Sequence, residues 1–161
     1  MARQRLLPAS LILSLAILAL AILAATASGN PNWTLTEFPL PAESAWPQAM
    51  AADGSGNLWF VEVGRDQVGR LVMAQATPGA SNGFSEFALT LGAWPQGMAM
   101  APDGSLWFAE YLADALGTVS PGGIVTEYQV LNPGSGPLDV ATDSDGSIWF
   151  VQSESNTVSH F

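Results

Sequence analysis

Apolar and polar residues alternate in short segments along the chain, and these segments recur at a regular spacing. The most distinct repeat is an Asp-Gly turn followed by Leu-Trp-Phe or Ile-Trp-Phe, with its tryptophan at Trp59, Trp107 and Trp149. These tryptophans lie 48 and 42 positions apart. A period of about 40–45 residues is typical of the blades of a β-propeller. The pattern therefore predicts an all-β fold made of repeated four-stranded sheets.

Each repeat contains the same kinds of strand in the same order. The first strand is a run of small and apolar residues that ends at the Asp-Gly turn, a strong hairpin signal. The second strand carries the Trp-Phe pair, and since side chains alternate along a strand, its two rings pack against both neighbouring blades. A third and a fourth strand complete the first two repeats. The expected repeats cover residues 43–88, 91–130 and 135–161, and the third contains no fourth strand.

One more strand is expected before the first repeat, at residues 33–38. It has the character of a fourth strand and is expected to complete the incomplete blade. With the strands of a blade lettered A to D, the order becomes D-ABCD-ABCD-ABC, a partial β-propeller of three four-stranded blades. Closed propellers usually have four to eight blades. The chain is therefore either a piece of a longer propeller or one half of a six-bladed homodimer.

The first 27 residues have a different character. Arg3 and Arg5 precede an apolar run from Leu6 to Ala25, and small residues follow at the positions that signal peptidase reads. This predicts a helical signal peptide at residues 1–27 and a secreted or periplasmic domain at residues 28–161. The alternative is an uncleaved N-terminal anchor, the only case in which we expect a membrane partner. The chain has no cysteine, so the exported fold depends on core packing and not on disulfides.

The charge balance limits the partners. The chain has 14 acidic and four basic residues, and two of the basic residues lie in the predicted signal peptide. An acidic surface repels phosphate, which argues against nucleic acid and anionic membranes as partners. A neutral or cationic small molecule remains compatible with this composition.

The repeats resemble the blades of the virginiamycin B lyase (streptogramin lyase) family. The family's blade motifs match this chain at Leu58–Glu62, Gly69–Leu71 and Ile124–Tyr128, and the resemblance extends over residues 33–161. It implies the architecture of a seven-bladed propeller. It also implies a C–O lyase that opens streptogramin B antibiotics by elimination, with Mg²⁺, a histidine base and acidic residues.

The catalytic residues that the resemblance implies are not present. Family histidines directly follow the first proline of a blade, where this chain has Gln48, Gln96 and Leu138. A family glutamate precedes that proline, where this chain has Trp46, Trp94 and Gly136. The single histidine, His160, stands in the third strand of a blade, where the family has arginine. No catalytic or metal-ligating residue is assigned, Mg²⁺ is expected only if the family activity is retained, and the question of enzyme activity stays open.

A ligand site is expected at the propeller mouth, where the loops before the first strands and after the second strands open on one face. The candidates are Trp46, Gln48, Glu62, Trp94, Gln96, Glu110, Tyr111, Gln152 and Glu154. Such side chains suit a small amphipathic ligand or a cation. In the alternative interpretation, Glu62 and Glu110 are structural and bond to the backbone of a neighbouring blade. Two functions follow: a streptogramin B lyase-like protein that is complete only in a longer product or an oligomer, or an exported binding or scaffolding propeller without catalysis.

Overall fold

The computed structural model describes residues 34–161, so the predicted signal peptide lies outside the described residues. Within this range the chain forms eleven strands and one short 3₁₀-helix, η1 (Val63–Arg65). All of these elements belong to one compact unit, Glu37–Phe161. In this part of the chain, no helix has the length and apolar character needed to cross a bilayer.

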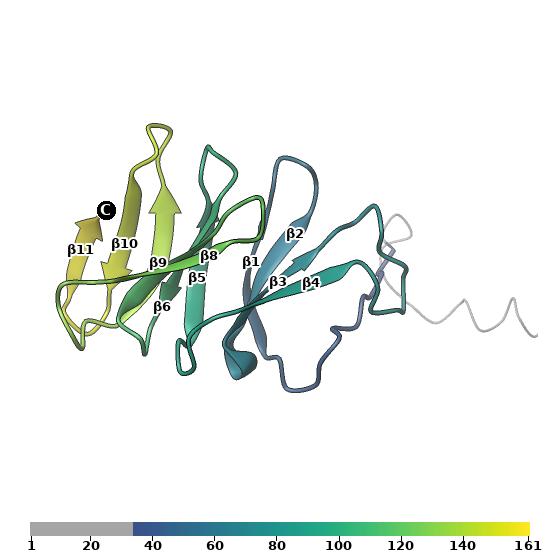
Figure 1. Cartoon of the computed structure of the whole chain (residues 1–161), viewed down its shortest axis with the longest axis horizontal. Coiled ribbons are helices and arrows are strands. Elements are labelled where there is room, and N and C mark those ends of the chain that lie inside the picture. The colour runs from purple at the N-terminus through teal and green to yellow at the C-terminus, as the bar shows by residue number, and fades with distance from the viewer. Residues whose placement is uncertain (1–33) are drawn as a thin grey trace, which may run out of the picture. The chain divides into compact units, whose positions relative to one another are not determined.

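The strands form three antiparallel sheets in chain order, side by side (Figure 1). The first sheet contains β1 (Pro47–Ala52), β2 (Leu58–Glu62), β3 (Gln67–Leu71) and β4 (Phe84–Ala88). The second contains β5 (Pro95–Met100), β6 (Leu106–Glu110), β7 (Ala115–Val119) and β8 (Val125–Gln129). The third contains β9 (Pro137–Thr142), β10 (Ile148–Gln152) and β11 (Thr157–His160). The predicted all-β fold of three propeller-like sheets is thus confirmed.

The Asp-Gly turns fix each hairpin through the aspartate side chain. The carboxylate of Asp53 accepts hydrogen bonds from the backbone N–H of Asn57 (2.9 Å) and Ser55 (2.8 Å) and from Nε1 of Trp59 (3.0 Å). Burial acts to raise the pKa of Asp53, but bonds from the Asn57 side chain, Trp59 and the turn backbone outweigh it and lower the pKa to about 2. The turn and the tryptophan that follows it are therefore tied together by one ionised group.

The core lies between neighbouring sheets. Trp59, Val61 and Val68 of the first sheet pack with Leu106, Phe108 and Val119 of the second. Ala109 and Leu116 of the second sheet pack with Val140, Ile148 and Phe150 of the third. The two rings of each Trp-Phe pair lie on opposite faces of the sheet, as the sequence predicts, because successive side chains alternate.

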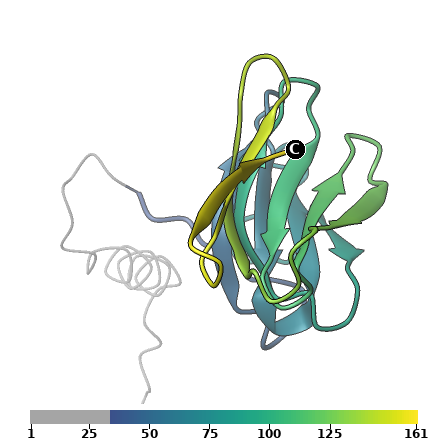
Figure 2. The ribbon, with the colours of Figure 1, turned by 90° about the vertical axis from the view of Figure 1, so that its left-hand side faces the viewer.

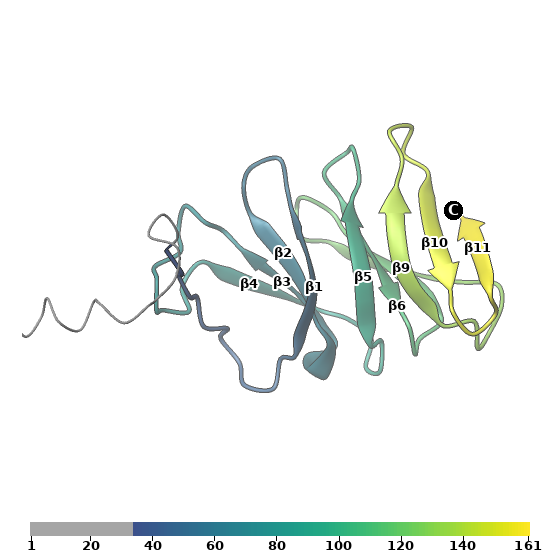
Figure 3. The ribbon, with the colours of Figure 1, turned by 180° about the vertical axis from the view of Figure 1, so that it is seen from behind.

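The first strands of the three sheets lie next to one another. β1 packs beside β5, and β5 packs beside β9, as Figure 3 shows. Their small residues, among them Ala51, Gly97 and Ala99, allow this close approach. The row formed by β1, β5 and β9 brings the starts of all three blades together, which positions the candidate site.

The predicted strand at residues 33–38 is wrong. Residues 34–38 form no strand, and the third sheet has only the strands β11, β10 and β9 (Figure 2). The carbonyl of Glu37 instead accepts a hydrogen bond from the N–H of Gly79 (2.8 Å), in the loop between β3 and β4. The physical reason is topological: a short connection to β1 holds Glu37 near the first sheet, and the second sheet separates it from the third.

Candidate functional site

The turn before each first strand meets the end of each second strand. The carbonyl of Trp46 accepts a hydrogen bond from the N–H of Val63 (3.3 Å), and that of Trp94 accepts one from Tyr111 (3.2 Å). In the third sheet the carbonyl of Gly136 accepts one from Ser153 (2.9 Å). The predicted convergence of these loops on one face is therefore confirmed, and this end of the sheets is the propeller mouth.

The residue before each of these first strands has a left-handed backbone. Trp46, Trp94 and Gly136 have φ values of 50°, 53° and 58°. This conformation is uncommon for a bulky side chain and persists only where the surroundings impose it. The left-handed backbone at Trp46 and Trp94 therefore calls for support from neighbouring groups.

An aspartate from the preceding sheet holds the turns at Trp94 and Gly136. Asp66 accepts hydrogen bonds from the N–H groups of Trp94 (2.9 Å) and Gly92 (2.8 Å). Asp114 accepts them from Gly134 (2.6 Å) and Gly136 (3.1 Å), and the Gly134 bond is the main cause that lowers its pKa. We call Asp66 and Asp114 the turn-holding aspartates. Their role was not predicted from the sequence, although each stands four positions after the last residue of β2 or β6.

A pocket of about 270 Å³ lies at the mouth between the second and third sheets. We call it the mouth pocket. It is lined by Trp94, Gln96, Tyr111, Leu138 and Ser153. The hydroxyl of Tyr111 donates a hydrogen bond to Oε1 of Glu154 (2.6 Å), and this bond is the main cause that raises the pKa of Tyr111. The structure thus brings together three predicted site residues, Trp94, Gln96 and Tyr111, with Glu154 beside them.

The other candidates lie elsewhere. Trp46 and Gln48 are exposed at the start of the first sheet and do not line the mouth pocket. Glu62, Glu110 and Gln152 end the second strands of the three sheets, and all three are buried. These three side chains therefore sit inside the blades and not on the open face of the mouth.

The two buried glutamates lack the backbone partners that the structural interpretation expected. Neither carboxyl oxygen of Glu62 or Glu110 receives a hydrogen bond. Burial, followed by the charge of Glu86, raises the pKa of Glu62. Burial also raises the pKa of Glu110, to about 8, with further contributions from the charge of Glu127 and a hydrogen bond to it. The expected hydrogen bonds from Glu62 and Glu110 to the backbone of a neighbouring blade are therefore wrong.

Glu127, on the fourth strand of the same sheet, is the carboxylate that acts most strongly on Glu110. Glu127 accepts hydrogen bonds from the N–H (2.8 Å) and hydroxyl (2.6 Å) of Thr90. Burial acts to raise the pKa of Glu127, but the bonds from Thr90 and Glu110 outweigh it and lower the pKa. The proton of the pair therefore stays on Glu110. In the third sheet Gln152 stands at the equivalent position and donates through Nε2 to Ser159 (2.7 Å) and Thr157 (3.0 Å).

The mouth does not fit the Mg²⁺ ion that the family resemblance implies. Among residues 34–161, no group of three or more His, Cys, Asp and Glu side chains is placed to hold a metal ion. Mg²⁺ prefers an octahedral set of oxygen ligands that includes carboxylates. The carboxylate beside the mouth pocket, Glu154, already accepts the hydroxyl of Tyr111.

The fold of this chain is similar to the folds of several solved proteins. No protein-family model and no curated protein sequence matches the chain. The crystal structure of virginiamycin B lyase from Staphylococcus aureus matches with a TM-score of 0.68 and 26% identity, over 82% of this chain and 46% of that chain. A catalytically inactive variant of that lyase with quinupristin gives a TM-score of 0.69, 25% identity and the same coverage. A streptogramin B lyase structure gives 0.69 at 23% identity, over 82% of this chain and 45% of that chain.

The fold is that of a virginiamycin B lyase-like β-propeller. The chain spans less than half of the length of the virginiamycin B lyase chains that it matches. At the position of the family histidine in the second sheet, Gln96 lines the mouth pocket, and in the third sheet Leu138 lines it. His160 lies in β11, with its ring 5.0 Å from that of Trp149, and does not line the mouth pocket.

Proposed function

We propose that this chain is a streptogramin B lyase-like propeller that binds an amphipathic cyclic peptide at its mouth and does not open it. The observation that carries the proposal is the mouth pocket, which Gln96 lines together with the aromatic side chains of Trp94 and Tyr111. An exported binding module fits the predicted signal peptide.

The chemistry of the mouth pocket suits binding better than elimination. Two aromatic side chains offer flat apolar surface, and the amide of Gln96 both donates and accepts hydrogen bonds. At about 270 Å³ the pocket holds one ring of a peptide ligand, and the exposed Trp46 and Gln48 extend the surface across β1. Elimination requires a base that removes a proton in the transition state. An amide does not take up a proton at neutral pH, so Gln96 orients a ligand and does not deprotonate it.

The test uses quinupristin and the full chain. Titration should quench tryptophan fluorescence with saturation, and incubation with Mg²⁺ should leave the chromatographic retention and absorbance of quinupristin unchanged. Trp94→Ala should weaken binding about tenfold, equivalent to ~1.4 kcal/mol for a lost aromatic contact. Trp149→Phe is the control, because Trp149 lies outside the mouth pocket. No saturable binding would refute the proposal, and opening of the ring would instead support the lyase alternative.

A further inference from the structure

The two boundaries between neighbouring sheets differ in the side chains that meet at the mouth. Three positions are compared: the residue after the second strand of one sheet, the residue before the first strand of the next sheet, and the second residue after that sheet's own second strand. The boundary between the second and third sheets has Tyr111, Gly136 and Glu154, and the boundary between the first and second has Val63, Trp94 and Leu112. Only the boundary between the second and third sheets thus joins an aromatic ring from one sheet to a carboxylate from the next.

The glycine makes room for this pair. A Cβ at Gly136 would lie 2.8 Å from Cε2 of Tyr111 and 2.8 Å from Cγ of Glu154. The tryptophan that stands at the equivalent position of the other two sheets would therefore collide with both side chains. Tyr111 and Glu154 meet in its place, and the tyrosine hydroxyl donates a hydrogen bond of 2.6 Å to Oε1 of the glutamate.

The mouth pocket adds a second aromatic ring to this pair. Trp94, which is 39% exposed, lines the pocket together with Tyr111. The negative face of an aromatic ring attracts a cation, and tryptophan does so most strongly. The bond from its hydroxyl to a carboxylate polarises Tyr111 and increases the negative charge on its ring. Two such rings beside a carboxylate suit an ammonium group whose substituents are carbon.

The surrounding charge also favours a cation. From residue 89 to residue 161 the chain has eight acidic residues and no lysine or arginine. The two arginines among residues 34–161 belong to the first sheet and its 3₁₀-helix: Arg65 donates a hydrogen bond to Gln67, and Arg70 lies over the ring of Trp59. Neither arginine lines the mouth pocket. A bound ammonium group therefore meets no lysine or arginine of the second or third sheet that would repel it.

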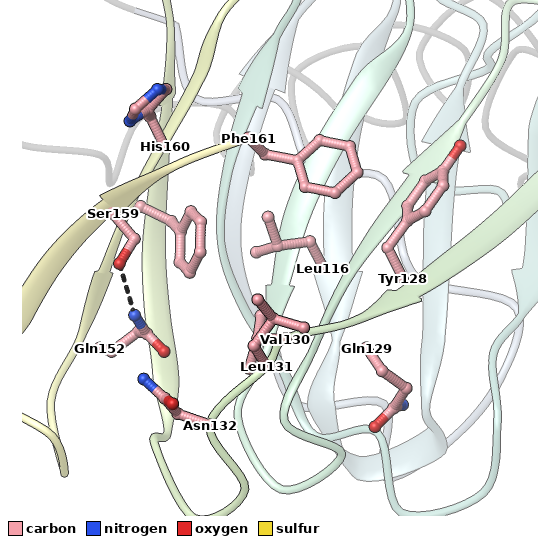
Figure 4. Close-up of a pocket in the computed structure, with 11 residues that line it drawn as sticks. Leu116, Tyr128, Gln129, Val130, Leu131, Asn132, Gln152, Ser159, His160 and Phe161 are labelled. Atoms are coloured by element: carbon pink, nitrogen blue, oxygen red, sulfur yellow. Dashed lines mark hydrogen bonds between the residues drawn. The ribbon is translucent and has the colours of Figure 1, made fainter.

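The pocket between β8 and β11 offers different chemistry (Figure 4). Its volume is about 390 Å³, and Tyr128 and Phe161 give it aromatic surface. None of the described residues that line it is acidic. A cation there would lose hydration without gaining a counter-charge. The mouth pocket is the better of these two pockets for a cation.

We propose that the mouth pocket binds an alkylated ammonium group, with the rings of Trp94 and Tyr111 against its carbon substituents and Glu154 as its counter-charge. This inference rests on the proposed function and deepens it, because the cyclic peptide then carries a basic, N-alkylated amine. At about 270 Å³ the pocket is smaller than sites that enclose a whole drug-sized ligand, so it takes this one group. Gln96, which is only 9% exposed, offers its amide oxygen to an N–H of the ammonium group.

Choline and 3,3-dimethylbutan-1-ol are the probes, because they differ only in the replacement of the ammonium nitrogen by carbon. The full chain is isotopically labelled, and the indole N–H signals of its tryptophans are followed by NMR at constant ionic strength. Trp94→Phe identifies the signal of Trp94. We expect choline to shift that signal with saturation in the millimolar range, and to bind about tenfold more tightly than the neutral alcohol.

Three variants test the assigned roles. Glu154→Gln keeps an oxygen for the Tyr111 hydroxyl and removes the charge, so it should weaken choline binding about threefold and leave binding of the alcohol unchanged. Tyr111→Leu should weaken choline binding about fivefold through loss of the ring. Asp143→Asn is the matched control, because it removes one charge from the turn between β9 and β10, and it should leave choline binding unchanged.

Equal affinity for the two probes would overturn the proposal, and so would no shift of the Trp94 signal at tens of millimolar choline. A loss of choline affinity that is the same for Glu154→Gln and Asp143→Asn would also overturn it, because general negative charge would then explain the binding. Any of these results leaves the proposed function standing if quinupristin still binds and Trp94→Ala weakens that binding. Selective binding of choline without binding of quinupristin would refute the cyclic peptide as ligand and leave the ammonium site in place.

Discussion

Replacement of Glu110 by glutamine should stabilise the fold at neutral pH. Glu110 is buried, neither of its carboxyl oxygens receives a hydrogen bond, and its pKa is raised to about 8. Gln152 shows that the same position in the third sheet accommodates an amide. Glutamine has nearly the shape of a protonated glutamate and can donate to Glu127, so Glu110→Gln preserves the packing and removes the titration.

The size of the effect follows from proton linkage. Below the ordinary value of 4.5, Glu110 is protonated in the folded and the unfolded chain, and the two proteins should be equally stable. Between 4.5 and about 8, only the unfolded chain releases the proton, so the free energy of unfolding falls by about 1.4 kcal/mol per pH unit. At pH 7 the accumulated loss is about 3 kcal/mol. For a domain of this size, the substitution should raise Tm by about 10 °C at pH 7.

Thermal unfolding followed by circular dichroism from pH 4 to pH 8 is the assay. The difference in Tm between Glu110→Gln and the unchanged chain should be near zero at pH 4 and grow steadily to pH 8. Glu43→Gln, at an exposed position, is the control and should show no such growth. A difference that is the same at pH 4 and pH 7 would show that Glu110 does not hold its proton in the folded state.

Two further substitutions test the packing and the turns. Gly117→Ala should lower the free energy of unfolding by about 3 kcal/mol in urea, because a Cβ there collides with the ring of Phe108. Gly122→Ala should change it little, because a Cβ there meets only the hydroxyl of Ser120, at 3.8 Å. Asp66→Ala should cost about 2 kcal/mol and weaken quinupristin binding, since two N–H groups of the turn at Trp94 lose their acceptor. Asp103→Ala, whose carboxylate bonds within its own turn, should cost less and leave binding intact.

The sheets were predictable because their signals are local. An Asp-Gly turn followed by Trp-Phe fixes a hairpin and both faces of its second strand, and the structure places Trp59 and Phe108 accordingly in the core. The convergence of Trp94, Gln96 and Tyr111 also followed from strand order alone. Repetition of the same motif along the chain carries this information without any knowledge of distant contacts.

The failures concern groups whose state depends on distant residues. Residues 34–38 have the pattern of a strand, but a pattern does not show whether a free sheet edge lies within reach. Glu62 and Glu110 stand at the ends of second strands, which predicts exposure at the mouth. The packing of the folded sheets buries both side chains, and this burial is not visible in the sequence. The turn-holding aspartates act on turns 26 to 28 and 20 to 22 positions further along the chain, so their role is visible only in three dimensions.

The turn-holding aspartates also change what counts as the module of this fold. Asp66 belongs to the first sheet but supports the entry to the second, and Asp114 does the same for the third. A sheet cut out at its own boundaries would therefore lose the support of its entry turn. The self-contained cassette instead runs from residue 66 to residue 113, and an engineered duplication of that cassette carries its own support for the blade that follows.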